Sequence, residues 1–586
     1  MSESVTASAG MATTDQIGDR TQISKSHHFG PYDLATTLLV LAITSIALWT
    51  FRDYAVSNDE GLQHHYGQLI LEYYRSGMTD ETVFGFRDLY LYGGLFDIVA
   101  ARLGEIFASI DVYDIRHILC ALIGIAGIAA TAATARTISG SRAGFIAAVA
   151  LAACGCWYGE MFNHTKDVPL AAGMIGATYM LIRIMRRLPR PHLGDVLLFG
   201  LLTGCALGIR VLALLLVFYA GFALLLAMPW SPQRNWRSIG RFMMRSIAYL
   251  CPAFIVAYLI MIAAWPWAAL APLNPVRGLF EFAEFQKHIE TLLDGHVYPM
   301  ESVPRLYVPI YILIRVSLMT LAGAAVGMLF AAASPLARRA GWQPSSRREI
   351  ALVVLTVAFP LACQVIAHGP AFTGLRHFTF VVPPLAVLAG IGIDAAVIAL
   401  SSWRKPFGFA VLAAASVYFA WNATVLVRLH PYEYLYYNPL VGGLGGASRL
   451  YVTDYWVNIM PEAVHKLEEY VDRTELGGSL TPHDYTVGVC GERVSFERER
   501  YAFERRLKRV RLRWIKNQQW GRADFFIAPT HLSCDKIIDG KVVVTISRLG
   551  VPIGYVKDRR PITQAALASS PAAKASLSTG ATSSTP

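Results

Sequence analysis

Long apolar blocks separated by short polar loops run through most of the chain, from about residue 34 to residue 427. Most blocks hold about 17–25 residues, the length that a helix needs to cross the hydrocarbon core of a bilayer. We predict about eleven such helices and a polytopic α-helical membrane protein. The blocks lie at about residues 34–51, 116–135, 143–158, 168–185, 193–209, 211–228, 246–270, 306–333, 349–367, 378–400 and 407–427.

The composition supports a membrane protein and excludes three other classes. Of 586 residues, 54% are hydrophobic and 16% are charged, and the mean hydropathy is +0.41. A soluble domain has about 25% charged residues, so a soluble enzyme, a disordered chain and a disulfide scaffold are excluded. Residues 1–33 are polar and lack the apolar core of a signal peptide. We expect them to form a disordered cytoplasmic tail before an uncleaved first helix.

Lysine and arginine are distributed unequally between alternate loops. One set of loops, from Arg136 to Lys405, carries sixteen of them, whereas the opposite set, without the long first loop, carries six. Because cytoplasmic loops are enriched in Lys and Arg, we predict that the chain spans the cytoplasmic (inner) membrane with its N-terminus on the cytoplasmic side. The loops 52–115 and 271–305 and the C-terminal region are then extracytoplasmic. The net charge of +11 needs no nucleic-acid partner to explain it.

Two extracytoplasmic regions carry further predicted structure. In the loop 52–115, two amphipathic runs at about 61–76 and 92–107 are too polar to span and should lie in the membrane interface. Residues 429–560 read as a small α/β domain, and 561–586 as a disordered tail. This domain has strand-like runs at 485–489, 524–527 and 542–546, a helical run at about 460–472, and an alternating basic run at 505–513 that favours a solvated strand face over lipid headgroup contact.

Cysteine and glycine patterns exclude some chemistry. Cys490 and Cys534 lie in the predicted outer domain, where disulfides persist, and a bond between them and two free thiols are equally expected. The spacing of Cys154 and Cys156 does not suit a zinc site. The chain lacks a phosphate-binding loop with Gly-Lys-Ser/Thr, and the glycines of 442–446 complete no dinucleotide motif, so ATP-driven work is not expected.

An acidic pair, Asp59-Glu60, follows the outer end of the first predicted helix. Charges at the membrane edge are costly and are therefore functional candidates. A carboxylate held there could act as a general base for a hydroxyl or amine acceptor. On composition alone, an N-cap of the following amphipathic helix is the favoured alternative.

Cations occupy three other outer positions. Lys166 stands in the loop Asn163-His164-Thr165-Lys166-Asp167-Val168-Pro169, where Pro169 and Asp167 suit the start of a helix. A lysine there suits a phosphate, or it snorkels to the interface. Arg210 and Arg376-His377 precede other helices, and each arginine suits phosphate or pairs with Asp59, Glu60 or Asp167. His64 and His65 are poor candidates for a metal site, because the side chains of adjacent residues on a helix point about 100° apart.

Taken in order, these motifs resemble the GT-C glycosyltransferases, in particular the branch of protein O-mannosyltransferases and aminoarabinose transferases. The resemblance covers about residues 34–430. It rests on Asp59-Glu60 in a long first outer loop, the 163–169 loop, Gly208-Ile209-Arg210, Arg376-His377-Phe378 with Pro383-Pro384, the run 436–443, and Asp454-Tyr455-Trp456. One departure is Asn-His-Thr-Lys-Asp, where many relatives have Asn-Pro-Lys-Asp.

The resemblance implies inverting transfer of a sugar from a polyprenyl-phosphate-linked donor to an extracytoplasmic acceptor. By analogy Asp59 would be the catalytic base, and Glu60 would orient the acceptor or the loop. Lys166, Arg210 and Arg376 would bind the donor phosphate, and His164, Asp167 and His377 are further site candidates. No cofactor is evident, a need for divalent metal stays open, and the acceptor is a protein, a lipid or a polysaccharide.

Two alternatives are weighed against this enzyme. A secondary transporter or lipid flippase predicts internal repeats and broken helices with charges near the midplane, whereas an assembly protein would only present the C-terminal domain. The discriminating observation is whether Asp59, Lys166, Arg210 and Arg376 converge on one outward cavity.

Overall fold

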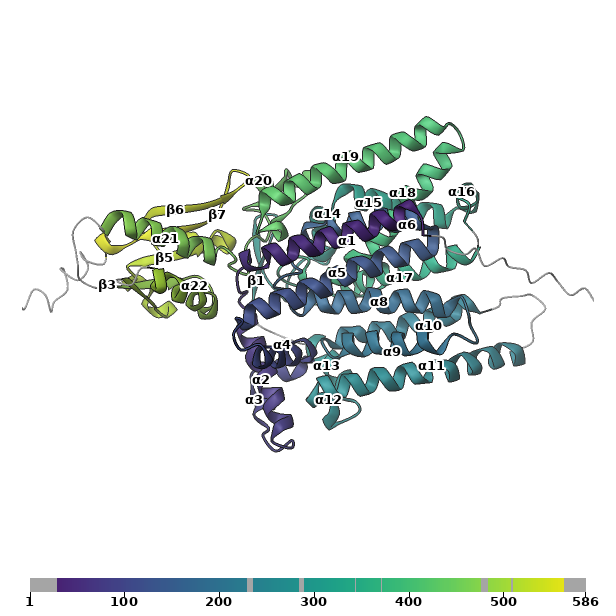
Figure 1. Ribbon diagram of the computed structural model, residues 1–586, viewed down its shortest axis with the longest axis horizontal. Helices are drawn as coiled ribbons and strands as arrows, with labels where there is room; N and C mark the ends of the chain where they lie inside the picture. The colour runs from purple at the N-terminus through teal and green to yellow at the C-terminus, as the bar shows by residue number, and fades with distance from the viewer. Residues whose placement is uncertain are drawn as a thin grey trace, which may run out of the picture.

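The computed structural model describes residues 29–228, 236–283, 289–342, 344–369, 371–475, 483–506 and 510–562. A bundle of long helices carries a smaller domain of strands and helices at one end (Figure 1). The predicted tails, apart from a few residues at their inner ends, and Arg234 of one basic loop lie outside the described residues.

Seven helices of the described chain are long and apolar enough to cross a membrane. Their lengths follow from the uninterrupted apolar blocks, since a helix satisfies all its backbone groups internally in lipid. They are α1 (Pro31–Thr50, continued by η1, Phe51–Asp53), α5 (Val112–Ser139), α8 (Asp167–Met185), α11 (Trp236–Ala264), α17 (Pro344–Ala367), α18 (Val382–Ser401, preceded by η4, Arg376–Val381) and α19 (Lys405–Leu429).

The remaining four predicted spans are also helical, but they are short or bent. Three short apolar helices are α6 (Ser141–Ala152), α9 (Leu193–Leu207) and α10 (Leu215–Ala227, preceded by η3, Val211–Leu214). The fourth is a pair, α14 (Tyr307–Arg315) and α15 (Leu318–Ala332), bent by 113°. The polytopic helical fold is therefore found, whereas the count of eleven crossings is supported only in part.

The helix predicted over 306–333 is present but broken near Val316, and a distant residue explains the break. The side-chain Nδ2 of Asn438 donates to the carbonyls of Leu313 and Val316, at 2.7 and 2.8 Å. Its backbone N–H donates to the carbonyl of Ile314. The carbonyls left unpaired at a helix end need such partners, and these come from a residue more than a hundred positions later.

Small residues let the centre of the bundle pack closely. Helix α18 is the most deeply buried of the seven long helices, and it packs on α15, α6 and α5. A Cβ atom on Gly392 would lie 2.0 Å from the carbonyl oxygen of Gly323 in α15. Close helix approach at small residues is typical of membrane bundles.

The first outer loop contains the two predicted amphipathic helices, α2 (Glu60–Arg75) and α4 (Leu95–Ile106), with α3 (Thr82–Gly85) and η2 (Leu89–Leu91) between them. Helix α2 buries Tyr66, Leu69, Ile70 and Tyr73. Figure 1 places α2, α4 and α13 (Asn274–Ala283) at the end of the bundle that carries the smaller domain. Other short elements are α7 (Gly155–Tyr158), α12 (Pro266–Leu270), β1 (Glu290–Leu293), β2 (His296–Pro299) and α16 (Ser334–Arg339).

The C-terminal domain has a five-stranded mixed sheet, in the order β4-β3-β5-β7-β6. The three strand-like runs and the helical run of the sequence are found in β3, β5, β6 and α21, and the basic run crosses into β4, where Arg511 and Arg513 are exposed and Val510 and Leu512 are buried. The elements are η5 (Glu433–Leu435), η6 (Pro439–Val441), α20 (Gly443–Ala447), α21 (Met460–Glu475), β3 (His483–Val489), α22 (Arg493–Arg506), β4 (Val510–Trp514), η7 (Asn517–Arg522), β5 (Phe525–Pro529), η8 (His531–Lys536), β6 (Lys541–Arg548) and β7 (Val551–Asp558).

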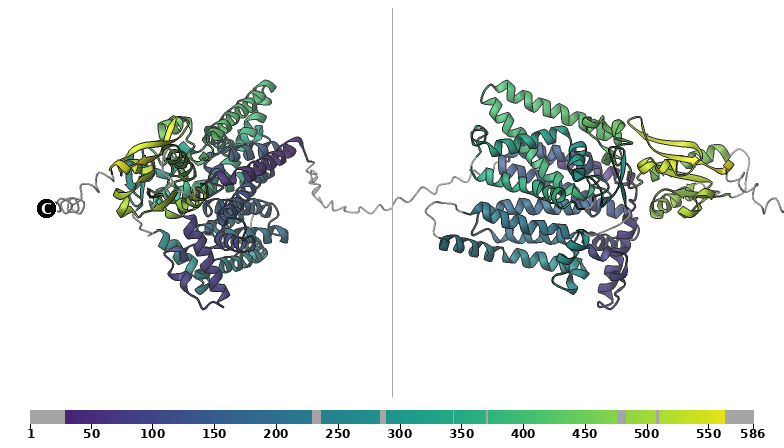
Figure 2. Two further views of the ribbon diagram at one scale, coloured as in Figure 1. Left: turned by 60° about the vertical axis from the view of Figure 1, so that its left-hand side comes forward. Right: turned by 180° about the vertical axis from the view of Figure 1, so that it is seen from behind.

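The two loop sets that differ in basic residues lie at opposite ends of the bundle. Figures 1 and 2 show α16 and the α18–α19 turn, both within the Arg-rich set, at the end away from the C-terminal domain. The structure contains no membrane, so which end faces the cytoplasm stays a prediction.

Candidate functional site

Asp59 occupies the N-cap position of α2, but its side chain does not cap the helix. Instead, Asp59 Oδ2 accepts a hydrogen bond from Arg376 Nη2 at 2.6 Å. The side chain of Asp59 is 41% exposed, whereas that of Arg376 is 10% exposed. The capping alternative is therefore not what the structure has, and the carboxylate faces a buried cation.

Arg376 begins a chain of ion pairs. Its Nε donates to Asp167 Oδ2 at 2.9 Å, and Arg210 Nη2 lies 2.9 Å from the other oxygen, Asp167 Oδ1. Asp167 is nearly buried, as the first residue of α8. The order Asp59–Arg376–Asp167–Arg210 thus joins four residues from four separate parts of the sequence.

Lys166 lies beside this chain among aromatic rings. Its Nζ is 4.3 Å from the ring centroid of Tyr92 and 5.7 Å from that of Tyr66. Within the described residues, the side-chain ammonium of Lys166 makes no hydrogen bond or ion pair. Burial lowers the pKa of Lys166 to about 8. The guanidinium of Arg210 is 5.7 Å from the same Tyr92 ring, so this ring, in the loop before α4, lies close to both cations.

Glu60 points away from Asp59 into the protein. Its Oε2 accepts from the backbone N–H of Ser57 at 2.7 Å and lies 3.4 Å from His117 Nε2, and its side chain is fully buried. Arg116 Nε lies 3.7 Å from Glu60 Oε1. The contacts suit a residue that holds the loop, and they leave no surface for an acceptor.

Sequence reasoning missed Arg116. The residue is fully buried and donates to Asp97 Oδ1 at 2.9 Å and to Thr165 Oγ1 at 3.0 Å, so it joins α5 to α4 and to the loop that carries Lys166. Burial raises the pKa of Asp97, against the opposing effect of Arg116. An arginine at the very start of a predicted span is the signal that could have indicated this pair.

Trp456 also contacts the site from the segment after α20. The guanidinium of Arg376 lies 4.1 Å from its ring centroid, a cation–π contact. His164 packs against the rings of Tyr434, Tyr455 and Trp456, and its Nδ1 lies 3.4 Å from Glu160 Oε2. His164 is thus buried among these rings and is not exposed to solvent.

A largely apolar cavity of about 590 Å³ adjoins Arg210. Arg210, His377 and Tyr92 are among its few polar side chains. Apolar side chains of η3, α10, α13, α17 and η4 make up most of the remaining wall, among them Leu212, Leu215, Phe280, Phe359 and Phe380. Of the four charges expected to converge, Arg210 lines this cavity, whereas Asp59, Lys166 and Arg376 are not in its lining. Apolar walls beside a guanidinium suit an amphipathic anion.

The described residues hold no group of three His, Cys, Asp or Glu side chains placed to bind a metal ion. His64 lies edge-on to Tyr113, and His65 lies edge-on to Phe86, so the two rings have different neighbours. The side chains of His64 and His65 therefore do not point to one shared site.

Residues 103–267 match the sequence model of the dolichyl-phosphate-mannose-protein mannosyltransferase family. The matched segment contains Lys166, Asp167 and Arg210, whereas Asp59 and Arg376 lie outside it. The match confirms the resemblance to this mannosyltransferase family over that segment of the chain. No curated protein matches the sequence.

Two solved structures are similar to the chain at low identity. One is ArnT from Cupriavidus metallidurans bound to undecaprenyl phosphate, with 14% identity, a TM-score of 0.45, and coverage of 89% of this chain and 97% of that one. The other is the archaeal oligosaccharyltransferase AglB from Archaeoglobus fulgidus in complex with an inhibitory peptide and a dolichol-phosphate. It has 11% identity, a TM-score of 0.44, and coverage of 84% and 69%. Likeness at this level assigns no residue role.

Proposed function

We propose that this protein transfers a sugar from a polyprenyl-phosphate-linked donor to an extracytoplasmic acceptor, with inversion at the anomeric carbon. The observation that carries the proposal is the ion-pair chain Asp59–Arg376–Asp167–Arg210, which ends beside a largely apolar cavity. A lipid-linked donor stores the energy of transfer in its sugar–phosphate bond, which agrees with the lack of a nucleotide-binding motif in the sequence.

In the proposed reaction, an acceptor oxygen or nitrogen attacks the anomeric carbon while its proton passes to the Asp59 carboxylate. The bond from the anomeric carbon to the phosphate oxygen breaks, and its electron pair stays on the polyprenyl phosphate. Asp59 is at one end of the ion-pair chain and Arg210 at the other. Inversion requires the base and the leaving group to act on opposite faces of the sugar, so in this proposal the phosphate would lie on the Arg210 side of the chain of ion pairs.

The cations would stabilise the leaving phosphate. Arg210 and Arg376 offer planar guanidinium groups, which bind phosphate oxygens bidentately. Lys166, next to Tyr92, adds a third positive charge. Because the phosphate gains negative charge as the bond breaks, cations already held in place lower the barrier. The apolar walls along α10 and α17 would receive the prenyl chain.

The site supports this proposal better than a transporter. The bent pair α14–α15 is the one broken span, among the described helices, of the kind that a transporter predicts. Arg315 at the bend, however, donates to the carbonyl of Tyr434 and stacks on the ring of Tyr437, so it anchors the segment after α19.

The test compares envelope glycans and glycoproteins by mass spectrometry in a deletion strain that carries wild type, Asp59→Asn or Glu81→Gln at equal abundance in the membrane. Glu81 is an exposed carboxylate in the same outer loop, so its neutralisation is the matched control. We expect Asp59→Asn to lower sugar transfer on the order of 10²–10⁴-fold, as for loss of a general base, and Glu81→Gln to restore it. Full restoration by Asp59→Asn would remove the catalytic role.

A binding measurement separates the phosphate role from the base. Undecaprenyl phosphate is the probe, and native mass spectrometry or ligand-induced thermal stabilisation of the purified protein is the readout. We expect Arg210→Ala to weaken binding and Asp59→Asn to leave it intact. Equal binding by Arg210→Ala and wild type would contradict the phosphate role of Arg210.

A further inference from the structure

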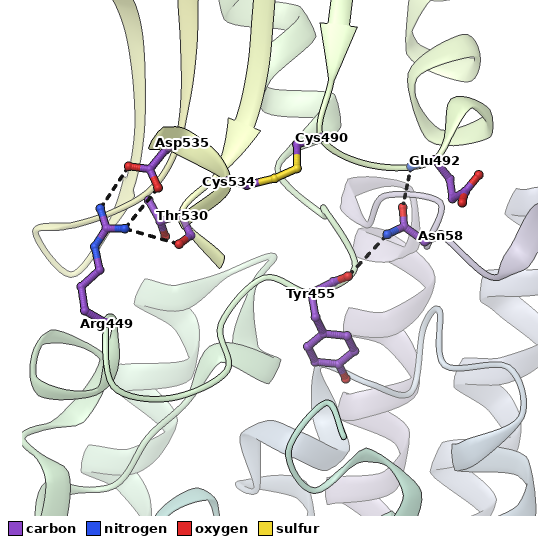
Figure 3. The surroundings of a disulfide bond; sticks show 8 residues. All are labelled: Asn58, Arg449, Tyr455, Cys490, Glu492, Thr530, Cys534 and Asp535. Carbon is purple, nitrogen blue, oxygen red and sulfur yellow. Dashed lines mark hydrogen bonds and ion pairs between the residues drawn. A yellow bond between two sulfur atoms is a disulfide. The ribbon is translucent and has the colours of Figure 1, made fainter. Parts of the chain in front are cut away.

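The C-terminal domain contacts the first outer loop at Asn58, the residue directly before Asp59. Asn58 Nδ2 donates to the backbone carbonyl of Tyr455 at 3.4 Å, and the backbone N–H of Glu492 donates to Asn58 Oδ1 at 3.1 Å (Figure 3). One amide side chain therefore connects the outer loop with two segments that follow it by about four hundred positions.

Both partners of Asn58 belong to parts of the chain that are tied to each other. Glu492 lies two residues after Cys490, which forms a disulfide with Cys534 across a Cα–Cα distance of 6.4 Å. The next residue, Asp535, accepts two hydrogen bonds from Arg449, at 3.1 and 3.2 Å (Figure 3). Arg449 leads into the segment that carries Tyr455 and Trp456. The contacts thus close a ring from Asn58 through the disulfide and back to Tyr455.

The same segment reaches the proposed catalytic residues directly. Trp456, next to Tyr455, stacks on the guanidinium of Arg376, which in turn binds Asp59. Asn58 therefore acts on Asp59 through the adjoining backbone, and Trp456 acts on it through Arg376, the ion-pair partner of Asp59.

Other contacts hold the loop on the side of the helix bundle. Ser57 Oγ donates to the carbonyl of Asn163, and Ser57 N–H donates to Glu60. On the opposite side, the first turn of α2 packs on α22, where a Cβ atom on Gly61 would lie 2.7 Å from Val494 Cγ2. Asp59 is 41% exposed and has one strong side-chain partner, so the orientation of its carboxylate depends on how its backbone is held.

We infer that Asn58 is a positioning residue, through which the disulfide-tied face of the C-terminal domain holds Asp59 in its reactive orientation. The inference rests on the proposed function. It assigns the C-terminal domain a part in the active site. The residue type fits the task, since an amide carries a donor for Tyr455 and an acceptor for Glu492 on separate atoms of one short side chain.

Loss of Asn58 should act locally. The domain keeps an independent attachment, because Arg498 Nη2 of α22 pairs with Asp114 Oδ1 of α5 at 2.6 Å. Asn58→Ala removes both hydrogen bonds, and Asn58→Asp retains an acceptor for Glu492 but loses the donor to Tyr455. Asn517, exposed in η7 of the same domain, serves as the matched control for an asparagine-to-alanine change.

The experiment uses the full chain and three readouts. Sugar transfer is measured as the rate of restored glycan signal in the deletion strain, undecaprenyl phosphate binding is measured on purified protein, and hydrogen–deuterium exchange is followed in peptides covering 55–64. For Asn58→Ala we expect transfer to fall on the order of 10- to 100-fold, as for a misplaced catalytic group. Binding and the melting temperature should equal those of wild type, exchange over 55–64 should rise, and Asn58→Asp should be intermediate.

Each other outcome has a definite meaning. If Asn58→Ala transfers sugar at the wild-type rate, the positioning role is overturned. It is also overturned if the control Asn517→Ala loses as much transfer, phosphate binding or thermal stability as Asn58→Ala does. Unchanged exchange over 55–64 also overturns it. If the wild type itself transfers no sugar, the proposed function is overturned. If the wild type and Asn58→Ala transfer sugar equally, only the positioning role is overturned.

Discussion

The Lys166 ammonium lies against the rings of Tyr92 and Tyr66 and forms no ion pair within the described residues, although the nearby carboxylates of Asp97 and Asp59 oppose the effect of burial on its pKa. Aromatic faces attract a cation, but they do not compensate for lost hydration as a carboxylate would, so burial lowers the pKa of Lys166 to about 8. The neighbouring arginines stay charged at any pH that a cell meets. Lys166 is therefore the cation of the proposed phosphate site whose charge can change near neutral pH.

We predict that binding of undecaprenyl phosphate weakens as the pH rises through about 8. Below that pH Lys166 carries its proton and attracts the phosphate, and above it the attraction is lost, which is worth about tenfold in affinity for a charged hydrogen bond. Binding is measured from pH 6.5 to 9.5 by titration calorimetry.

Lys166→Arg is the control for this prediction, because it keeps the charge and should bind with no fall through this pH range. Lys166→Met should bind weakly at every pH. A pH-dependent fall of the same size in Lys166→Arg would assign the titration to another group.

At the scale of elements, the turn that carries Arg210 is held by two neighbours. The backbone N–H of Leu95 donates to the carbonyl of Gly208, and that of Gly94 donates to the carbonyl of Ala264, each at 2.9 Å. A Cβ atom on Gly93 would lie 2.1 Å from the Gly208 carbonyl oxygen. The start of α4 therefore packs backbone to backbone against the ends of α9 and α11.

We predict that Gly93→Ala displaces the Gly208–Arg210 turn. Overpacking costs about 1–3 kcal/mol, and a backbone neighbour cannot rotate away as a side chain can. The melting temperature of the purified protein should fall, and undecaprenyl phosphate binding should weaken. Gly85→Ala is the control, since a Cβ atom there meets nothing within 4 Å. Equal melting temperatures for the two variants would show that the turn adapts.

At the scale of the whole molecule, the arginines that predict the topology also bind the bundle together. Arg136 pairs with Asp33, Arg142 with Asp394, and Arg186 with Glu349. These pairs join α1 to α5, α6 to α18, and α8 to α17. They lie toward the end of the bundle away from the C-terminal domain, so the basic residues serve both orientation and packing.

We predict that this Arg-rich end faces the cytoplasm and that the C-terminal domain is extracytoplasmic. Single cysteines introduced at exposed Arg404 and exposed Lys541, in a background without other reactive thiols, are labelled in intact cells with a membrane-impermeant maleimide. Label should reach position 541 in intact cells and position 404 only after lysis. Labelling of 404 in intact cells would reverse the orientation.

Sequence reasoning predicted the helical membrane fold, the amphipathic helices of the first outer loop and the strands of the C-terminal domain. It did so because these features depend on local spacing of apolar residues, which sets the length and the exposed face of each element. It also indicated Asp59, Lys166, Arg210 and Arg376, because charges at the ends of apolar blocks stand out from their surroundings.

The pairing of these charges, in contrast, follows from the three-dimensional fold. Sequence left Arg376 free to bind phosphate, Asp59 or Asp167, and the structure pairs it with both carboxylates. The same holds for the break at Val316, where Asn438 supplies the missing hydrogen bonds, and for Asn58, whose partners are Tyr455 and Glu492. Such contacts join residues hundreds of positions apart, and no local pattern of the chain encodes which distant group will lie within hydrogen-bond distance.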